Sequence, residues 1–136
     1  MTQYVLVAGD SKKNLSLVKK LLSEHDVEIV PAPTTALALF LAQKNFPCAI
    51  VCDRTFRDGE GIFFLQEVKA DKELRSIPFI FLLPTQVDPP VESDLIKSGA
   101  CAVVDLQQSQ KLLALLRKFI GKAQQRTQRN QNESTE

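Results

Sequence analysis

The sequence has no tryptophan, one tyrosine, one methionine, one histidine and only three cysteines among its 136 residues. The cysteines and the lone histidine do not form the tight cluster of a structural zinc site, because His25 lies apart from them in the polar stretch SEHD. An odd number of cysteines does not suit a disulfide framework. Because Cys48, Cys52 and Cys101 lie in apolar, strand-like runs, we interpret them as reduced thiols of the core.

The chain also lacks a long apolar run and an excess of one charge. No stretch approaches the roughly 20 apolar residues that span a bilayer, and the start, MTQYVLVAGD, leads into a strand without a basic leader. Lys and Arg total 17 while Asp and Glu total 16, so the charge balance favours neither nucleic acid nor an anionic membrane as a partner. We expect a cytoplasmic protein that contacts neither directly.

What the sequence does contain is a regular alternation of apolar runs and amphipathic stretches. Apolar, often β-branched runs predict strands at 4–8, 27–30, 49–51, 79–83 and 100–104. Helical spacing of apolar residues among lysines predicts a first helix that spans 12–22. Capping residues and turn signals predict further helices that begin at Thr34 or Thr35, at Glu60-Gly61, at Asp88-Pro89-Pro90 and at Ser109. Such strict alternation predicts one α/β domain with a parallel sheet covered on both faces.

The end of the chain reads QQRTQRNQNESTE after Ala123 and contains no apolar residue. A segment of this composition cannot bury a face against the domain. We therefore expect a folded domain over 1–123 and a disordered polar tail over 124–136.

Two carboxylates follow two predicted strands directly. Asp10 comes after the run YVLVA, and Asp53 comes after the run that ends CAIVC. Because the carboxyl ends of parallel strands form one edge of a sheet, both residues lie where α/β proteins bind ligands. Such a pair suits magnesium, which takes one or two carboxylates together with a phosphate oxygen. Two solvated residues at strand ends would give the same pattern, so the pair alone does not decide between these readings.

With this order of elements, the chain resembles the receiver domain of bacterial two-component response regulators, closest in layout to the stand-alone chemotaxis-type receivers. The resemblance covers Tyr4 to about Lys122 and implies a flavodoxin-like (βα)5 sandwich with strand order 2-1-3-4-5. It also implies that Asp53 is the phospho-accepting aspartate. Asp10, Asp53 and the backbone carbonyl of Thr55 are then the metal ligands, if the site binds magnesium.

Two further stretches carry this resemblance. Gly61 stands eight positions after Asp53 and is followed by the apolar pair Phe64 and Leu65, as in the family's loop and third helix. The stretch Lys97-Ser98-Gly99-Ala100 resembles the family's A-G-A signature before the last strand.

The departures from the family's pattern are concentrated at the same site. Gly9 stands where the first acidic residue of the pair is expected. Leu83 replaces the family's threonine or serine after the fourth strand, with Thr85 two residues further on, and Leu106 replaces its lysine after the fifth. A phosphoaspartate needs fixed positive and hydrogen-bonding partners, which apolar side chains do not supply.

Three cations lie in the loops beside the two carboxylates, namely Lys12, Arg54 and Arg57. They could replace the missing lysine, or they could pair with Asp10, Asp53 and Asp58 and close the site without metal. Solvent-facing loop charges would also explain them.

Two functions follow from these residues. The first is a pseudo-receiver whose phosphorylation switch is weakened or lost and which acts through protein contacts, on the face of the fourth and fifth helices and fifth strand that includes Val103. The second is a working phosphoacceptor, phosphorylated at Asp53 by a histidine kinase with Thr85 or Arg54 as substitute partners. In either case we expect no enzyme activity, a histidine kinase or other signalling protein as partner, and output through a separate protein.

A flavin carrier or phosphatase on the same kind of sheet is disfavoured. The loop GDSKKN after the first strand is poor in glycine and hydroxyl groups for holding a phosphate, and Thr55 occupies the place of the second aspartate of an aspartate-nucleophile phosphatase. No helix-turn-helix follows the domain, which disfavours direct DNA binding.

Overall fold

The computed structural model describes the backbone of residues 3–134 and the side chains of residues 3–122. Five parallel strands form the central sheet, in the order β2-β1-β3-β6-β7, and five helices cover it. The elements in chain order are β1 (Tyr4–Ala8), α1 (Lys12–Leu21), β2 (Glu28–Ala32), α2 (Thr35–Lys44), β3 (Ala49–Cys52), β4 (Thr55–Phe56), β5 (Gly59–Glu60), α3 (Gly61–Ala70), β6 (Phe79–Leu83), α4 (Pro89–Lys97), β7 (Ala102–Asp105) and α5 (Ser109–Ser134). The predicted order 2-1-3-4-5 is confirmed, with β6 and β7 as the fourth and fifth strands of the sheet.

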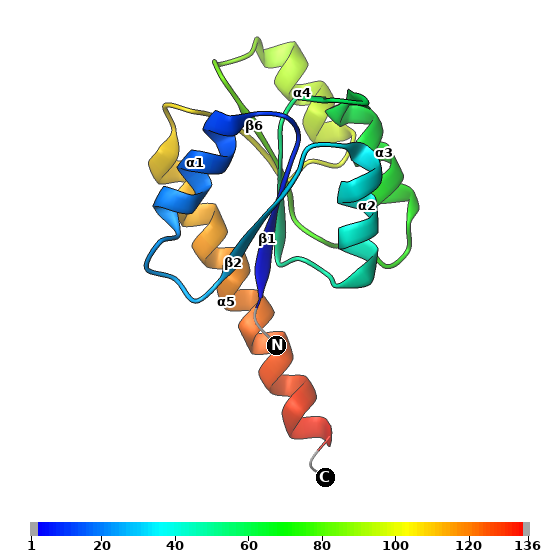
Figure 1. Ribbon diagram of the computed structural model, residues 1–136, viewed down its shortest axis with the longest axis vertical. Helices are drawn as coiled ribbons and strands as arrows, with labels where there is room; N and C mark the ends of the chain where they lie inside the picture. Colours follow the sequence, from blue (N-terminus) through cyan, green and yellow to red (C-terminus); the bar gives the residue numbers. More distant parts are fainter. Residues whose placement is uncertain (1–2, 135–136) are drawn as a thin grey trace.

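The helices form two layers, with α1 and α5 on one face of the sheet and α2, α3 and α4 on the other (Figure 1). Each face has its own apolar core. Leu6, Ile50 and Phe79 point toward α2 and α3, whereas Val5, Val51 and Ile80 point toward α1 and α5. The alternation follows from the period of two along each strand, and all five strands except β2 are buried throughout.

The predicted helix ends are confirmed in several places. Thr34, one of the two predicted caps of α2, accepts a hydrogen bond from the Leu37 N–H. Ser11, which was not predicted as a cap, caps α1 by accepting one from the Asn14 N–H. The helix α4 begins at Pro89, directly after Asp88. Gly99 follows its C-cap with a φ of 122°, a left-handed conformation that glycine adopts without strain.

Three expectations are wrong in detail. A two-stranded antiparallel hairpin, β4–β5, lies between β3 and α3, where the sequence predicted only a loop. Cys101 is exposed, unlike the buried Cys48 and Cys52, because it lies in the turn before β7. Val103 is only 7% exposed and belongs to the core, so it does not lie on the surface of the edge strand β7.

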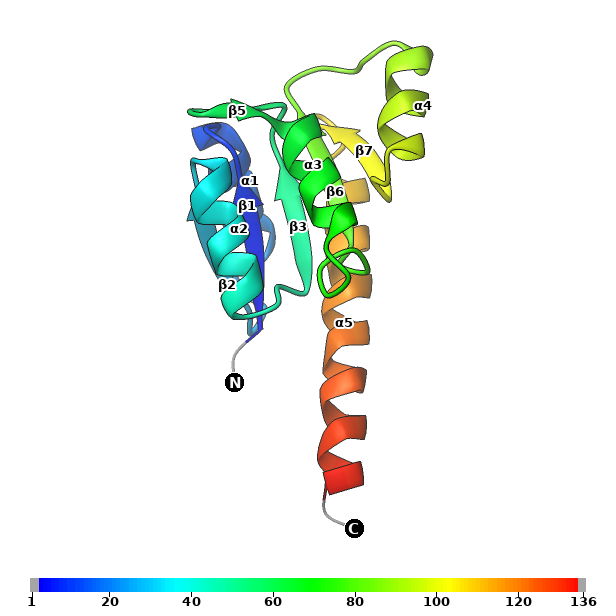
Figure 2. The same cartoon turned by 90° about the vertical axis from the view of Figure 1, so that its right-hand side faces the viewer.

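The backbone of α5 continues as a helix through the polar tail to Ser134 and extends beyond the body of the domain (Figure 2). Gln, Arg, Lys and Ala are good helix formers, and no proline interrupts the segment. The side chains from residue 123 on and all of residues 135–136 lie outside the described part, so the domain boundary at 123 and the disorder of the tail stay predictions. Among the described residues, no helix is both long and apolar enough to cross a membrane.

Candidate functional site

The site lies at the carboxyl edge of the sheet, where Asp53 directly follows β3. The Asp53 N–H donates to the carbonyl of Ala8 at 2.8 Å, which fixes the start of the loop against the end of β1. Its Oδ1 accepts from the Arg54 N–H at 2.7 Å. Asp53, Asp10 and Thr55 are thus brought to one edge, as the sequence predicted.

Gly9 and Asp53 lie in close contact. Gly9 has a φ of 122°, and a Cβ on this residue would lie 2.4 Å from the Cβ of Asp53 and 3.0 Å from the carbonyl oxygen of Thr55. No side chain fits at position 9 unless the loop that follows β3 moves. The acidic residue that the family has at position 9 would therefore not fit in this structure.

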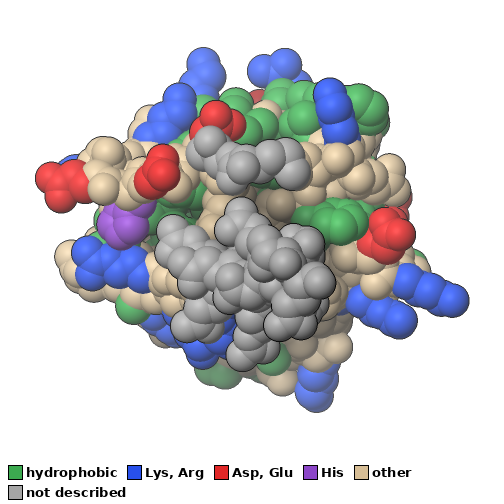
Figure 3. Space-filling view, turned by 90° about the horizontal axis from the view of Figure 1, so that it is seen from below, with side chains coloured by type: hydrophobic (Ala, Val, Ile, Leu, Met, Phe, Trp, Pro, Cys, Tyr) green, Lys and Arg blue, Asp and Glu red, His purple; other side chains and the backbone are tan. Residues whose placement is uncertain are grey.

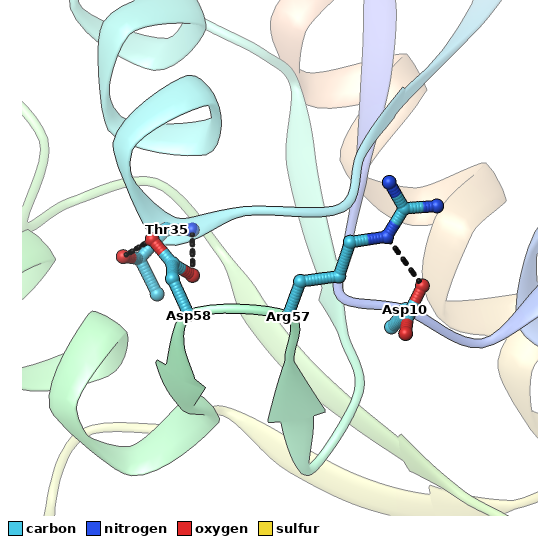
Figure 4. Close-up of polar contacts among 4 residues, drawn as sticks. All are labelled: Asp10, Thr35, Arg57 and Asp58. Atoms are coloured by element: carbon cyan, nitrogen blue, oxygen red, sulfur yellow. Dashed lines mark hydrogen bonds and ion pairs between the residues drawn. The ribbon is translucent and has the colours of Figure 1, made fainter.

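The backbone N–H and the carboxylate of Asp10 both contact the loop and hairpin that follow β3. Its backbone N–H donates to the Thr55 carbonyl at 3.2 Å. Its carboxylate oxygen Oδ1 lies 3.2 Å from Nε of Arg57, with the two side chains 49% and 64% exposed. Figure 4 shows Arg57 reaching across from the hairpin toward Asp10. The sequence left open whether the loop cations pair with the carboxylates, and the structure shows that Arg57 pairs with Asp10.

The same hairpin is fixed to α2 on its other side. Asp58 accepts hydrogen bonds from the N–H and the hydroxyl of Thr35, both at 2.7 Å, so it occupies the helix end rather than the site (Figure 4). These two bonds lower the pKa of Asp58, the backbone N–H having the larger effect. The N–H of Arg57 donates to the carbonyl of Pro33 at 3.0 Å. Both residues of the hairpin turn are thereby held in place.

Gly61 closes the loop that begins at Asp53. A Cβ on Gly61 would lie 2.4 Å from the carbonyl oxygen of Asp53 and 3.1 Å from the Phe81 ring. Its N–H donates to the carbonyl of Arg54 at 2.8 Å. This close approach explains why glycine stands eight positions after Asp53.

The carboxyl of Asp53 lies in a poorly solvated place. Partial burial raises its pKa, the Arg54 N–H lowers it, and the neighbouring charge of Asp10 raises it further. The adjacent Cys52 is fully buried, and burial together with Asp53 raises the pKa of its thiol well above the usual range. Cys52 is therefore a neutral core thiol and no nucleophile.

A cavity of about 360 Å³ opens beside Asp53. It is lined by Ser11, Asp53, Arg54, Thr55, Leu83, Pro84, Thr85 and Val87. Leu83 is 2% exposed and ends β6 at the place of the family's hydroxyl residue, whereas Thr85 lies on the same cavity further out. The cavity thus contains hydroxyl groups and one guanidinium group, but its floor next to Asp53 is apolar.

The end of β7 has a local hydrogen-bond arrangement in place of the family's lysine. The buried Asp105 accepts from the Gln107 N–H at 2.8 Å, and its own N–H donates to Oε1 of Gln108 at 3.0 Å. The Leu106 N–H donates to the carbonyl of Leu83 at 3.0 Å. No cation extends from this loop toward Asp53 among the residues that line the cavity beside it.

Sequence reasoning missed Asn14, which is 2% exposed. Its Nδ2 donates to the carbonyl of Leu82 at 2.9 Å. The pairing of β3 with β6 ends one residue earlier, at Phe81. Asn14 therefore supplies the hydrogen bond that β3 no longer gives to the Leu82 carbonyl. The signal was present in the sequence, since Asn14 falls on the same helical stripe as the buried Val18 and Leu22.

The residues fit a magnesium ion poorly. Of the expected ligands, Asp10 pairs with Arg57, the Thr55 carbonyl accepts the Asp10 N–H, and position 9 has no carboxylate. Within the described part of the chain, no three His, Cys, Asp or Glu side chains form a group that could hold a metal. A cation that coordinates Oδ1 of Asp10 would have to displace Arg57 first.

In the view from below, basic and acidic side chains are both spread over the surface that surrounds the grey atoms (Figure 3). This distribution agrees with the near-neutral charge balance of the chain.

The comparisons with known proteins agree with this architecture. No family model matches the chain. It is 28% identical over 101 residues to the polar-differentiation response regulator DivK of Brucella ovis, which covers 74% of this chain and 80% of that protein.

Solved structures show the same fold. The chemotaxis response regulator CheY4 of Vibrio cholerae superposes with a TM-score of 0.74 at 22% identity, over 88% of this chain and 99% of that one. The receiver domain of a sensor histidine kinase from Pseudomonas aeruginosa PAO1, which has a magnesium ion in its active-site cleft, superposes with a TM-score of 0.74 at 18% identity, over 89% and 99%.

Proposed function

We propose that the chain is a response-regulator receiver domain and, within that class, a pseudo-receiver, which signals through protein contacts and has a weakened or absent phosphorylation switch. In this proposal it acts in the cytoplasm, a histidine kinase or another signalling protein contacts it, and a separate protein carries the output. It does not bind nucleic acid itself.

The observation that carries the proposal is the contact between Gly9 and Asp53. A second acidic side chain next to Asp10 has no space, because its Cβ would come within 2.4 Å of the Cβ of Asp53. Asp10 itself is held by Arg57. The two changes together leave a metal ion with less negative charge and fewer free oxygens than a receiver's acid pair supplies.

The apolar residues at the ends of β6 and β7 support the same conclusion. A phosphoryl group on Asp53 would bring about two negative charges beside Leu83, while Leu106 offers no cation. A ligand shifts a conformational equilibrium only by the difference in its interaction free energy with the two states. Without the hydroxyl residue and the lysine of the family at positions 83 and 106, the phosphoryl group has little such difference to exert on α4 and β7.

The contact surface in this proposal is the face formed by α4, β7 and α5. Its exposed apolar residue is Ile96 on α4, which is 41% exposed, whereas Val103 packs inside. The strand β7 is the last strand of the sheet, so its outer backbone edge is available to this face.

One observation favours the alternative of a working phosphoacceptor. Ser11, Arg54 and Thr85 line the same cavity as Asp53, and their hydroxyl and guanidinium groups are of the kind that contact phosphoryl oxygens. The exposed side chains of Arg54 and Thr85 would have to turn inward to replace the lysine and the threonine of the family.

Incubation with acetyl phosphate and magnesium, followed by intact mass measurement, separates the two functions. We expect no gain of a phosphoryl group by a chain whose thermal melt shows that it is folded. A gain that is lost in Asp53→Asn but kept in Asp58→Asn would replace the pseudo-receiver with the phosphoacceptor. A receiver that has the complete site serves as the positive control for the phosphodonor.

A further inference from the structure

The helix α4 lies over the sheet without burying a single side chain completely. Its inward-facing residues Val91 and Leu95 stay partly exposed because a cavity of about 370 Å³ separates them from α3. We name this cavity the α3–α4 cleft. Its volume lies within the range of small-molecule sites, which is about 300–1,000 Å³.

The inner surface of the α3–α4 cleft is apolar. Phe81 and Leu83, at the carboxyl end of β6, are almost fully buried and line it, and Ile62 of α3 lies opposite Val91 and Leu95 of α4. These side chains come from three elements, α3, β6 and α4, whose positions the fold fixes. A ligand of moderate size could therefore bury its apolar part without any rearrangement of the core.

The charges on the cleft are unequal. One cation, Arg54, and two carboxylates, Glu60 and Asp94, line it. Arg54, Thr55 and Leu83 also line the cavity beside Asp53, so the cleft adjoins a third carboxylate. An anion would meet one arginine among these carboxylates, whereas a cation has two carboxylates available within the cleft itself.

We propose that the α3–α4 cleft binds a small cationic amphiphile. An aromatic or branched apolar body contacts Phe81, Leu83 and Leu95, and an ammonium or amidinium group pairs with Glu60 or Asp94. Occupation of the cleft fills the space under α4 and places the ligand beside Arg54, next to the Asp53 cavity. This inference does not depend on whether Asp53 is phosphorylated.

Three probes with the same phenyl and two-carbon body test the proposal on the full chain. They are 2-phenylethylamine, which is cationic, 2-phenylethanol, which is neutral, and 3-phenylpropionate, which is anionic. Titrations are followed by the methyl NMR signals of Ile62, Leu83, Val91 and Leu95. We expect saturable shifts with the cation, which binds at least about fivefold more tightly than the anion and loses part of this preference at high salt.

Variants then separate the apolar from the charged contribution. Val91→Phe fills the cleft and should weaken binding of all three probes by about tenfold or more, whereas Ile96→Phe, on an exposed position of the same helix, should not. Glu60→Gln combined with Asp94→Asn should remove the preference for the cation and leave the neutral probe unchanged. Both of these residues are exposed, so this variant tests the site even if Val91→Phe does not fold.

Methyl signals that do not saturate, or binding that is unchanged in Val91→Phe, would overturn the site. Tighter binding of the anionic probe would overturn the class of ligand.

Discussion

Arg57 and Asp10 form an ion pair across the carboxyl edge of the sheet, with Nε and Oδ1 3.2 Å apart. The pair joins the β4–β5 hairpin to the start of α1 and occupies a carboxylate that a receiver uses for metal. Because the pair lies at the surface, it contributes little to the stability of the fold. Its main effect is on the availability of the Asp10 carboxylate.

Arg57→Ala should therefore increase the affinity for a divalent cation with little effect on folding. We expect the free energy of unfolding to change by less than about 1 kcal/mol. Paramagnetic broadening of the Asp10 and Asp53 signals by Mn²⁺ measures the affinity. The same substitution at Arg75, in the polar stretch after α3, is the control. Equal Mn²⁺ affinity in the parent and in Arg57→Ala would show that the ion pair does not limit metal binding.

Gly9→Ala should destabilise the domain by about 2 kcal/mol or more, because it combines an unfavourable φ with a collision against Asp53. Gly59→Ala is the matched control, since nothing lies within 4 Å of a Cβ at that position. Urea denaturation of both variants measures the difference. A Gly9→Ala protein as stable as Gly59→Ala would mean that the loop after β3 yields easily, and would weaken the argument for a closed site.

Asn14→Ala should leave the carbonyl of Leu82 buried without a hydrogen-bond partner. The loss of this bond costs about 1–3 kcal/mol, and the better helix propensity of alanine offsets about 0.5 kcal/mol of it. Ser16→Ala, on an exposed position of the same helix, should change the stability by less than about 0.5 kcal/mol. The midpoints of denaturant unfolding, compared at an unchanged dependence of the free energy on denaturant, measure both variants. Asn14→Ala should have a clearly lower midpoint than Ser16→Ala.

Thr35→Val should raise the pKa of Asp58, because it removes the hydroxyl bond and keeps the backbone one. The folded pKa of Asp58 is lowered relative to the unfolded chain. Its contribution to stability is therefore present above the unfolded pKa, near 4, and is lost as the pH falls through the folded pKa. The difference in melting temperature between the parent and Thr35→Val should accordingly shrink below about pH 4.

Titration of the Asp58 carboxyl carbon by NMR checks this prediction directly. Thr34→Val is the control, because it removes the cap of α2 without touching Asp58 and should lower stability at every pH while leaving the pKa of Asp58 in place. An unchanged Asp58 pKa in Thr35→Val would show that the backbone N–H alone accounts for the shift.

The sequence by itself determined the architecture and the place of the site. Apolar runs with a period of two, separated by helical stripes, are local features, so the five strands of the sheet lie close to their predicted ranges. Asp10 and Asp53 could be placed on one edge because parallel strands all end at the same edge. Gly9, Leu83 and Leu106 were visible as departures from a receiver's pattern without any coordinates.

Only the tertiary structure decided how the loops at that edge meet. The segment Thr55–Glu60 has no apolar period, so no residue pattern predicted its hairpin. Arg57 pairs with Asp10, and Asp58 binds Thr35, because of where β1, α2 and β3 lie in space. The collision at Gly9, the exposure of Cys101 and the burial of Val103 likewise involve segments distant in the sequence. Contacts of this kind are set by packing geometry to within an ångström, which residue patterns do not contain.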